Sequence, residues 1–228
     1  MRTCIVSTLI CIVAWVRLPA QSLPYLKYDN IPSGWRAPIS KALEWYPELA
    51  HARIRFRVRH ARSPLATNRD WMAFLWHFGR QAYIVTISDR TIPALSPILF
   101  DSLDDGAKLG VIGHELSHVS DFSRRNLFGW LSLGFGHLSS RYLDRMEFAT
   151  DSLCIAHGLG CALLDWSLFV RHALQTHTWR GADNLPADGQ PPQSKMTPAL
   201  KMSPSHKMSR ERYMNPETIM ARLQRPCE

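Results

Sequence analysis

The strongest constraint on the fold lies between Val111 and Val119, where the chain reads Val-Ile-Gly-His-Glu-Leu-Ser-His-Val. Two histidines four residues apart lie on one face of a helix, so His114 and His118 can present their ring nitrogens to a single ion. Glu115 follows the first histidine and can reach a water molecule at that ion. The pattern therefore predicts a helix over about residues 107–122 that carries the first half of a metal site.

This helix is predicted to be buried on two sides. At 100° per residue, Val111 and Phe122 lie beside the two histidines. The opposite side gathers four aliphatic residues, Leu109, Ile112, Leu116 and Val119. Buried imidazoles beside a carboxylate need a compensating charge, which a dication supplies. Histidines satisfied inside a core without a metal are the alternative.

A third ligand is expected downstream, in the stretch Arg-Met-Glu-Phe-Ala-Thr-Asp that ends at Asp151. Glu147 stands 29 residues after His118 and one helical turn before Asp151. Leu143 and Cys154 share its side of the helix, where an unpaired carboxylate would be costly. We therefore expect Glu147 to bind the metal, and two acids on a solvated helix are the alternative.

With these motifs the sequence resembles the gluzincins, a clan of zinc metallopeptidases, over about residues 81–160. The similarity is greatest to their single-domain members, the minigluzincins, and to the catalytic domain of membrane peptidases that process prenylated proteins. It implies an α+β, zincin-like single domain in which a small antiparallel or mixed sheet packs on the metal-binding helix and on a glutamate helix. The C-terminal half is expected to be mainly helical.

The resemblance also assigns roles to the site residues. It implies one Zn²⁺ ion held by His114, His118 and Glu147, with Asp151 orienting the ring of His114. Glu115 would be the general base that activates a water molecule for peptide-bond hydrolysis. In the family a strand borders the cleft and pairs with the substrate, and the strand predicted over residues 81–88 takes that place here.

Relatives add a Tyr, His or Arg that stabilises the oxyanion. The candidates here are His206, Arg212, Tyr213 and Tyr142. The first two resemble, weakly, a downstream His-Pro-x-x-x-x-Arg pattern in the membrane relatives. Lys207 stands in the proline position.

Other ligand arrangements receive less support from the sequence. A metzincin needs a glycine and a third histidine soon after the second, and Asp121 and Arg124 occupy those positions. Asp121 lies one turn beyond His118 and stays an alternative ligand. His137 lies in a glycine-rich stretch and is not chosen.

The first twenty residues have the pattern of a secretory signal peptide. Arg2 precedes an apolar run from Cys4 to Val16, and Ala20 suits cleavage before Gln21. The run is shorter than the ~20 residues that a membrane-spanning helix needs. An exported protein, periplasmic or secreted, is therefore expected, and an uncleaved anchor is the alternative. No later stretch approaches membrane-spanning length, so no integral membrane segment is expected after cleavage.

The chain is basic, with a formal charge of +8 that includes two arginines of the predicted signal peptide. Much of this charge lies in residues 51–62, where four arginines alternate with apolar residues: Arg53, Arg55, Arg57 and Arg59. This period of two predicts a strand with one apolar and one basic face. A solvated face is the favoured interpretation and contact with an anionic partner the alternative. Nucleic-acid binding has no further support.

The 228 residues are predicted to form one domain over residues 21–177, followed by a linker or mobile loop. That linker, residues 178–205, is rich in Gly, Pro, Ser, Gln and Lys. Residues 206–228 would dock back as a helix, with Asn215 as its cap. Further helices are expected over residues 36–50, from about Ser96, from Ser139 or Ser140 to His157, and over residues 161–174.

Three cysteines remain after signal cleavage, so they cannot all pair within the chain. They are Cys154, Cys161 and Cys227. A bridge between the first two requires the helix to end near Gly158, because seven helical residues separate Cα atoms by ~10 Å.

The sequence thus predicts a monomeric zinc endopeptidase that acts on proteins or peptides. A non-catalytic exported binding protein with a structural zinc site is the first alternative. A latent peptidase whose own linker covers the cleft is the second. Glu115 favours catalysis, because a purely structural site needs no base.

Overall fold

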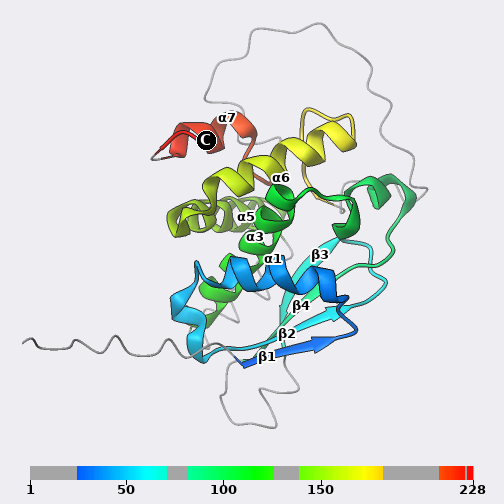
Figure 1. Cartoon of the computed structure of the whole chain (residues 1–228). Coiled ribbons are helices and arrows are strands. Elements are labelled where there is room, and N and C mark those ends of the chain that lie inside the picture. Colours follow the sequence, from blue (N-terminus) through cyan, green and yellow to red (C-terminus); the bar gives the residue numbers. More distant parts are fainter. Residues whose placement is uncertain (1–24, 71–81, 126–138, 182–210, 224, 228) are drawn as a thin grey trace, which may run out of the picture.

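The fold was obtained as a computed structural model, which describes residues 25–70, 82–125, 139–181, 211–223 and 225–227 (Figure 1). Helices and strands are both present, and every described element after residue 87 is helical. The predicted α+β class is confirmed. The predicted linker falls mostly on residues outside the described part.

A four-stranded mixed sheet forms one layer, with the strand order β1-β2-β4-β3. The first three strands in that order run parallel, and β3 is an antiparallel edge strand. The strands are β1 (Tyr25–Asp29), β2 (Arg53–Val58), β3 (Leu65–Arg69) and β4 (Ala82–Ile87). The two strands predicted from alternation and β-branched residues, β2 and β4, are confirmed.

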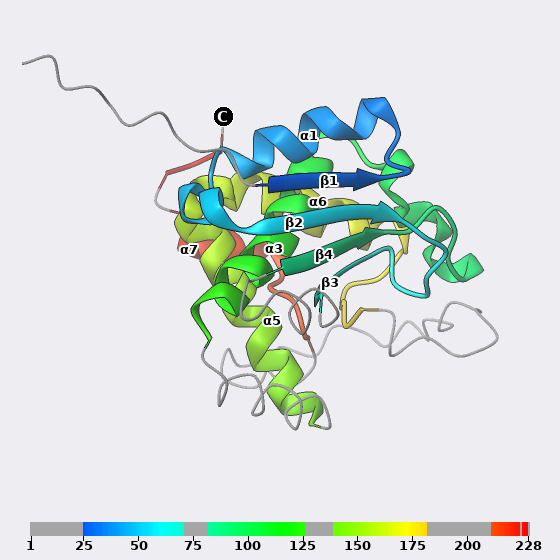
Figure 2. The ribbon, with the colours of Figure 1, turned by 90° about the horizontal axis from the view of Figure 1, so that it is seen from below.

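Alternation along β2 decides which face of the sheet meets the core. Ile54 and Phe56 are 1% and 0% exposed and belong to the main hydrophobic core, whereas Arg53, Arg55 and Arg57 are only partly buried on the other side. Helices α3 (Asp105–Arg124) and α6 (Gly160–Ala173) lie behind the strands when the molecule is seen from below (Figure 2). The opposite face of the sheet is covered by no described helix.

The helical elements surround a central helix, α3, which contacts α1, α5, α6 and β3. The α-helices are α1 (Ser33–Leu43), α3 (Asp105–Arg124), α5 (Ser140–Cys154), α6 (Gly160–Ala173) and α7 (Pro216–Arg222). The shorter turns are η1 (Pro47–His51), η2 (Pro93–Ile98), η3 (Phe100–Ser102) and η4 (Ile155–Leu159).

Local signals explain most helix ends. Asp104 caps α3 by accepting a hydrogen bond from the backbone N–H of Ala107 at 2.7 Å. Asn215 caps α7 in the same way, as predicted, through the N–H of Thr218 at 2.8 Å. Gly158, which follows the predicted helix end at His157, has φ 87° at the bend between α5 and α6. The helix predicted over residues 36–50 instead ends at Leu43.

Helices α3 and α6 cross at a glycine. A side chain added at Gly110 would place its Cβ 2.0 Å from the backbone oxygen of Ala162 and 2.9 Å from the backbone nitrogen of Leu163. Only glycine allows so close an approach, so this contact fixes the separation of the two helices.

A disulfide joins Cys161 at the start of α6 to Cys227 near the chain end. Cys154 is buried and free. Of the three cysteines left after signal cleavage, two therefore form one bridge with a sequence separation of 66, and Cys154 does not pair with Cys161. The bridge fastens the C-terminal segment, including α7, to α6.

One helical stretch is apolar over a length that could span a membrane. Counted as a continuous helix, Ser140–Ala173 spans 34 residues, and its most apolar window has a mean hydropathy of 1.7. By length and composition alone this stretch could cross a membrane, so the prediction that no later stretch approaches that length is wrong. In the fold it is bent at Gly158, and 44% of that window is buried within the protein.

Candidate metal centre

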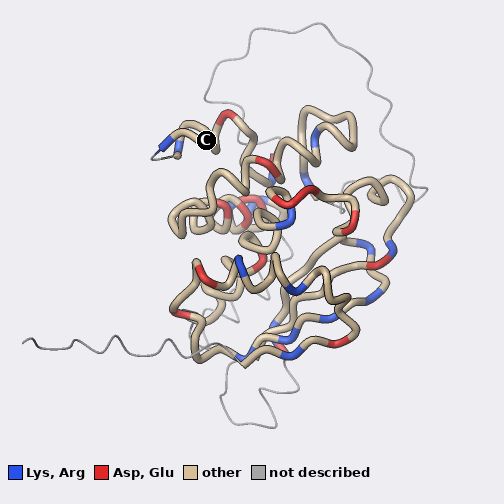
Figure 3. Tube along the Cα trace, in the orientation of Figure 1, with Lys and Arg blue, Asp and Glu red and all other residues tan. Residues whose placement is uncertain are grey.

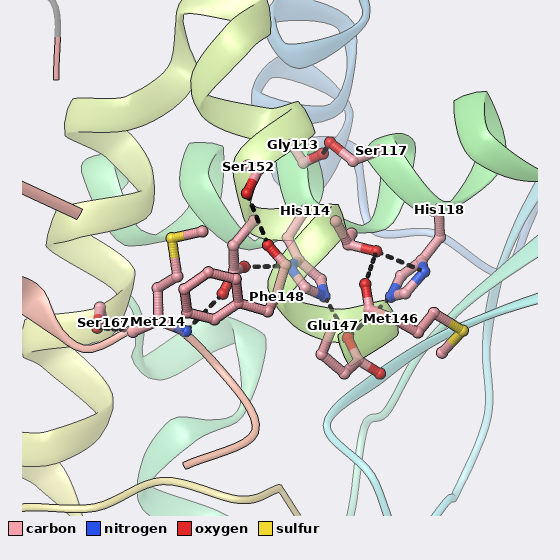
Figure 4. A network of polar contacts seen from close by, with 12 residues as sticks. Gly113, His114, Ser117, His118, Met146, Glu147, Phe148, Ser152, Ser167 and Met214 are labelled. Atoms are coloured by element: carbon pink, nitrogen blue, oxygen red, sulfur yellow. Dashed lines mark hydrogen bonds and ion pairs between the residues drawn. The ribbon is translucent and has the colours of Figure 1, made fainter. Parts of the chain in front are cut away.

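Two neighbouring helices bring three potential ligand atoms to one point (Figure 4). His114 and His118 come from α3 and Glu147 from α5. The Oε2 atom of Glu147 lies 3.1 Å from the Nε2 atom of each histidine. All three ligand atoms lie within 4.8 Å of one another, so these residues could hold a metal ion.

The partner of His114 fixes its protonation. Its Nδ1 lies 2.8 Å from Oδ1 of Asp151, whose other oxygen accepts the backbone N–H of Met214 at 2.7 Å. A carboxylate with two such neighbours accepts hydrogen bonds, so the ring donates from Nδ1. Its Nε2 lone pair is then directed toward Glu147 and free to bind a cation.

Thr150 determines which ring nitrogen of His118 carries the proton, as Asp151 does for His114. The Thr150 hydroxyl donates to the carbonyl oxygen of Met146 at 2.9 Å and lies 3.2 Å from Nδ1 of His118. A hydroxyl has one proton to give, so it accepts the Nδ1–H of His118. Both histidines therefore turn an Nε2 lone pair toward the carboxylate.

The lone pairs of each Nε2 and of the Glu147 oxygen face each other across 3.1 Å, so a positive charge is needed between them. Burial lowers the pKa of His114, but the hydrogen bonds and charges of Asp151 and Glu147 outweigh it and raise this pKa well above its usual value. Burial raises the pKa of Glu147, yet the charge of His118 and the contacts to both rings leave it lower than usual. A proton can supply the charge, and a divalent cation can replace it.

Two of the three separations between ligand atoms are close to those around a tetrahedral ion. Ligand atoms at ~2.0–2.1 Å from a tetrahedral metal are ~3.3 Å apart. The two separations between nitrogen and oxygen are 3.1 Å, and all three atoms lie within 4.8 Å of one another. Small movements of the side chains would therefore admit an ion.

Glu115 has a different environment from Glu147. It is 6% exposed, and its Oε2 has no hydrogen-bond partner among the described residues. Its backbone oxygen accepts the hydroxyl of Thr67 on β3 at 3.2 Å. With His114 it lines a cavity of about 40 Å³, enough room for a water molecule. Glu115 thus combines a carboxylate oxygen that has no described partner with a place in the wall of this cavity.

The structure separates the candidates for the oxyanion donor. The ring of Tyr213 lies 5.6 Å from that of His114 and lines the same cavity as Glu115. Burial, followed by the charges of Glu147 and Glu115, raises its pKa well above the usual value, so the phenol keeps its proton. Arg212 instead pairs with Asp144, with 3.3 Å between Nε and Oδ1.

The remaining candidates lie elsewhere. Tyr142 packs against the hydrophobic core, and Asp121 forms an ion pair with Arg125 at 2.7 Å. His206 and His137 lie outside the described residues.

The prediction that β4 pairs with substrate is wrong. Residues 81–88 were expected to pair with substrate, but β4 is already hydrogen-bonded to β2 on one side and β3 on the other. Among the described strands, the edge of the sheet nearest the candidate metal centre belongs to β3, which contacts α3. Its sequence, Leu-Ala-Thr-Asn-Arg, lacks the alternation that marks a strand.

Three partners of the site were not predicted. Thr150 offered a weak signal, because it lies on the Glu147 side of α5. The amide of Met214 and the hydroxyl of Thr67 reach the site only through the tertiary fold. A backbone donor leaves no mark in the residue type, so the first of these could not be found from the sequence.

No family model matches this chain, and no curated protein or solved structure matches it either. The resemblance to the gluzincins therefore remains a prediction that rests on the sequence motifs.

The bond between Asp151 and His114 can be tested directly. In Asp151→Asn the amide can turn its NH₂ toward Nδ1, which moves the ring proton to Nε2 and blocks that ligand atom. Divalent-metal affinity, measured by competition with a chelating dye, should fall about 10- to 100-fold. Asp144→Asn, the same change on the same helix, should alter it less than about 3-fold. Equal affinities of Asp151→Asn and wild type would contradict this role.

Proposed function

We propose that this protein is a zinc-dependent endopeptidase of the gluzincin type with a zincin-like fold. One observation carries the proposal: two Nε2 lone pairs and a carboxylate oxygen converge beside a second, buried carboxylate whose Oε2 has no described partner. A structural ion would need the first three groups only. Glu115 is the additional group that a hydrolytic site needs as its general base.

Zinc is the metal that this donor set suits best. Two imidazole nitrogens and one carboxylate oxygen are typical of catalytic zinc sites, in which a fourth position is open. The ion would supply Lewis acidity toward a water molecule and toward the carbonyl of the scissile peptide. His114, His118 and Glu147 would hold it, and Asp151 and Thr150 would fix the two rings.

The protein's own groups would carry the proton transfers. Glu115 would accept the proton of the attacking water and then pass it to the leaving amine. Tyr213, which lines the same cavity and keeps its phenolic proton, would donate a hydrogen bond to the oxyanion. We favour Tyr213 over Arg212 for this role because the guanidinium of Arg212 lies against Asp144.

An extended peptide is the proposed substrate. The outer edge of β3 has no strand partner among the described residues and is tied to the backbone of Glu115 through Thr67. An added strand would find backbone donors and acceptors there, next to the reacting groups. This mode selects segments that are unfolded or loosely folded, whatever their sequence.

We further propose that the protein is exported and acts as a monomer. The disulfide between Cys161 and Cys227 supports export, because such bonds persist mainly in oxidising compartments.

Metal removal tests the whole proposal. The purified protein should bind one zinc ion and cleave members of a peptide library. A chelator should abolish cleavage, and a stoichiometric amount of zinc should restore it. Metal bound without cleavage, even after proteolysis within residues 178–205, would favour the structural site of a binding protein. Cleavage only after that proteolysis would favour the latent form.

A further inference from the structure

The face of the sheet turned away from the helices is basic. We call this side of the sheet the outer face. Figure 3 shows Lys and Arg following one another along its strands. On β2 the three arginines of the basic strand, Arg53, Arg55 and Arg57, point to it, because the residues between them point to the core.

The strand register extends this basic surface onto β1. Tyr25 lies opposite Arg53, and Lys27 lies opposite Arg55. The guanidinium of Arg53 covers the ring of Tyr25 at 4.9 Å, and that tyrosine is 60% exposed. The Lys27 side chain is 53% exposed. Cationic groups therefore reach solvent together with an aromatic ring.

A shallow pocket lies within this surface. Its volume is about 220 Å³, and its lining includes Lys27, Arg53, Arg55, Tyr25 and a single acid, Asp70. The one acid pairs with Arg55, with 3.7 Å between Oδ2 and Nη1. A second acid, Asp29, lies outside the lining, 3.5 Å from Lys27 and 3.6 Å from Arg55. Three cations therefore face two acids, which leaves a net positive charge suited to a phosphate group.

We infer that the outer face docks on an anionic lipid bilayer, with a headgroup phosphate in this pocket. A bilayer surface is broad and flat, like the open face of a sheet, and carries many phosphates at once. Each Lys or Arg near such a surface contributes roughly 5-fold to affinity. The cations of the outer face can act together only on a partner of that kind.

The chain outside the described residues favours lipid over other anionic partners. Residues 71–81 connect Asp70 to Ala82, and the backbones of these two residues are hydrogen-bonded at 2.8 Å. The register puts Ala82 at the same end of the sheet as Arg53. By sequence the connecting segment has two tryptophans and two phenylalanines. Apolar and aromatic residues beside basic ones are typical of membrane-surface binding.

Nucleic acid fits this face less well. Single strands bind across several exposed aromatic rings on which bases stack. Tyr25 is the only aromatic residue that the described strands turn to the outer face, and Arg53 already covers it.

Vesicle co-sedimentation tests the inference. Protein that begins at Gln21, as expected after signal cleavage, is mixed with vesicles of phosphatidylcholine and with vesicles in which one lipid in three is phosphatidylglycerol. At about 0.1 M salt we expect at least ~30-fold tighter binding to the anionic vesicles. The double variant Lys27→Gln, Arg53→Gln should lose roughly 25-fold of that affinity. Both residues are partly exposed, so the fold, followed by circular dichroism, should not change.

A matched variant shows whether binding depends on the cations of the outer face or only on the net charge of the protein. Lys41→Gln with Arg124→Gln removes two cations from α1 and α3 and should weaken binding less than ~3-fold. Equal loss in both variants, equal binding to both kinds of vesicle, or tighter binding to single-stranded DNA or polyglutamate would overturn the inference. Because the measurement needs neither metal nor cleavage, its outcome is independent of the proposed peptidase activity.

Discussion

Replacing Glu115 by glutamine is expected to reduce peptide hydrolysis about 10²- to 10⁴-fold, the usual contribution of a general base. The amide has nearly the shape of the carboxylate but cannot take a proton from water at neutral pH. Glu115 supplies none of the three converging ligand atoms, so zinc should stay bound. Initial rates on a fluorescent peptide, together with zinc content by mass spectrometry, measure both effects.

Glu147→Gln provides the matched control for this experiment. It makes the same chemical change on the partner helix, but at a carboxylate that lies 3.1 Å from both histidines. Activity and zinc should be lost together in this variant, and added zinc should partly restore activity. Full activity of Glu115→Gln with zinc bound would remove Glu115 from the mechanism and with it the main argument for an enzyme.

The largest effect on stability is expected from Gly110→Ala. The added methyl group would meet the backbone of Ala162 at 2.0 Å, and backbone atoms cannot rotate away as a side chain can. Helices α3 and α6 would have to separate, which also moves the turn that carries His114. We expect the free energy of unfolding to fall by about 3 kcal/mol, the upper part of the range for overpacking. The melting temperature would drop by about 6 °C or more.

Gly34→Ala is the comparison for this variant. Gly34 also lies in a helix, α1, but a Cβ there meets nothing within 4 Å. Because alanine favours helix more than glycine does, this variant should melt at or above the wild-type temperature. If both variants melted alike in circular dichroism, the close contact between α3 and α6 would not be a determinant of stability.

Local patterns predicted the elements that hold the ligands. The spacing of His114 and His118 required a helix, and Glu147 with Asp151 required a second one. Gly158 marked the bend between α5 and α6 because glycine readily takes a left-handed conformation. In these cases the deciding interactions lie within a turn or two of the residue, so the order of residues is enough.

The elements that were missed depend on distant partners. Strands β1 and β3 have only five residues each, and β3 lacks alternation. They become strands by pairing with β2 and β4. Helix α1 ends at Leu43, before Pro47, which begins a separate turn. The contact of Met214 with Asp151 spans 63 residues and uses a backbone group. Pairings over such distances are decided by the packing of the whole domain.

The disulfide between Cys161 and Cys227 closes the last third of the chain into a covalent ring that includes residues 182–210. A single cut in that arc would open the ring without releasing the fragment that carries Tyr213 and Met214. The two polypeptides would migrate as one species on a denaturing gel until a thiol reductant divided them. A protein built in this way can lose a peptide bond there and still keep the fragment that steadies its first histidine.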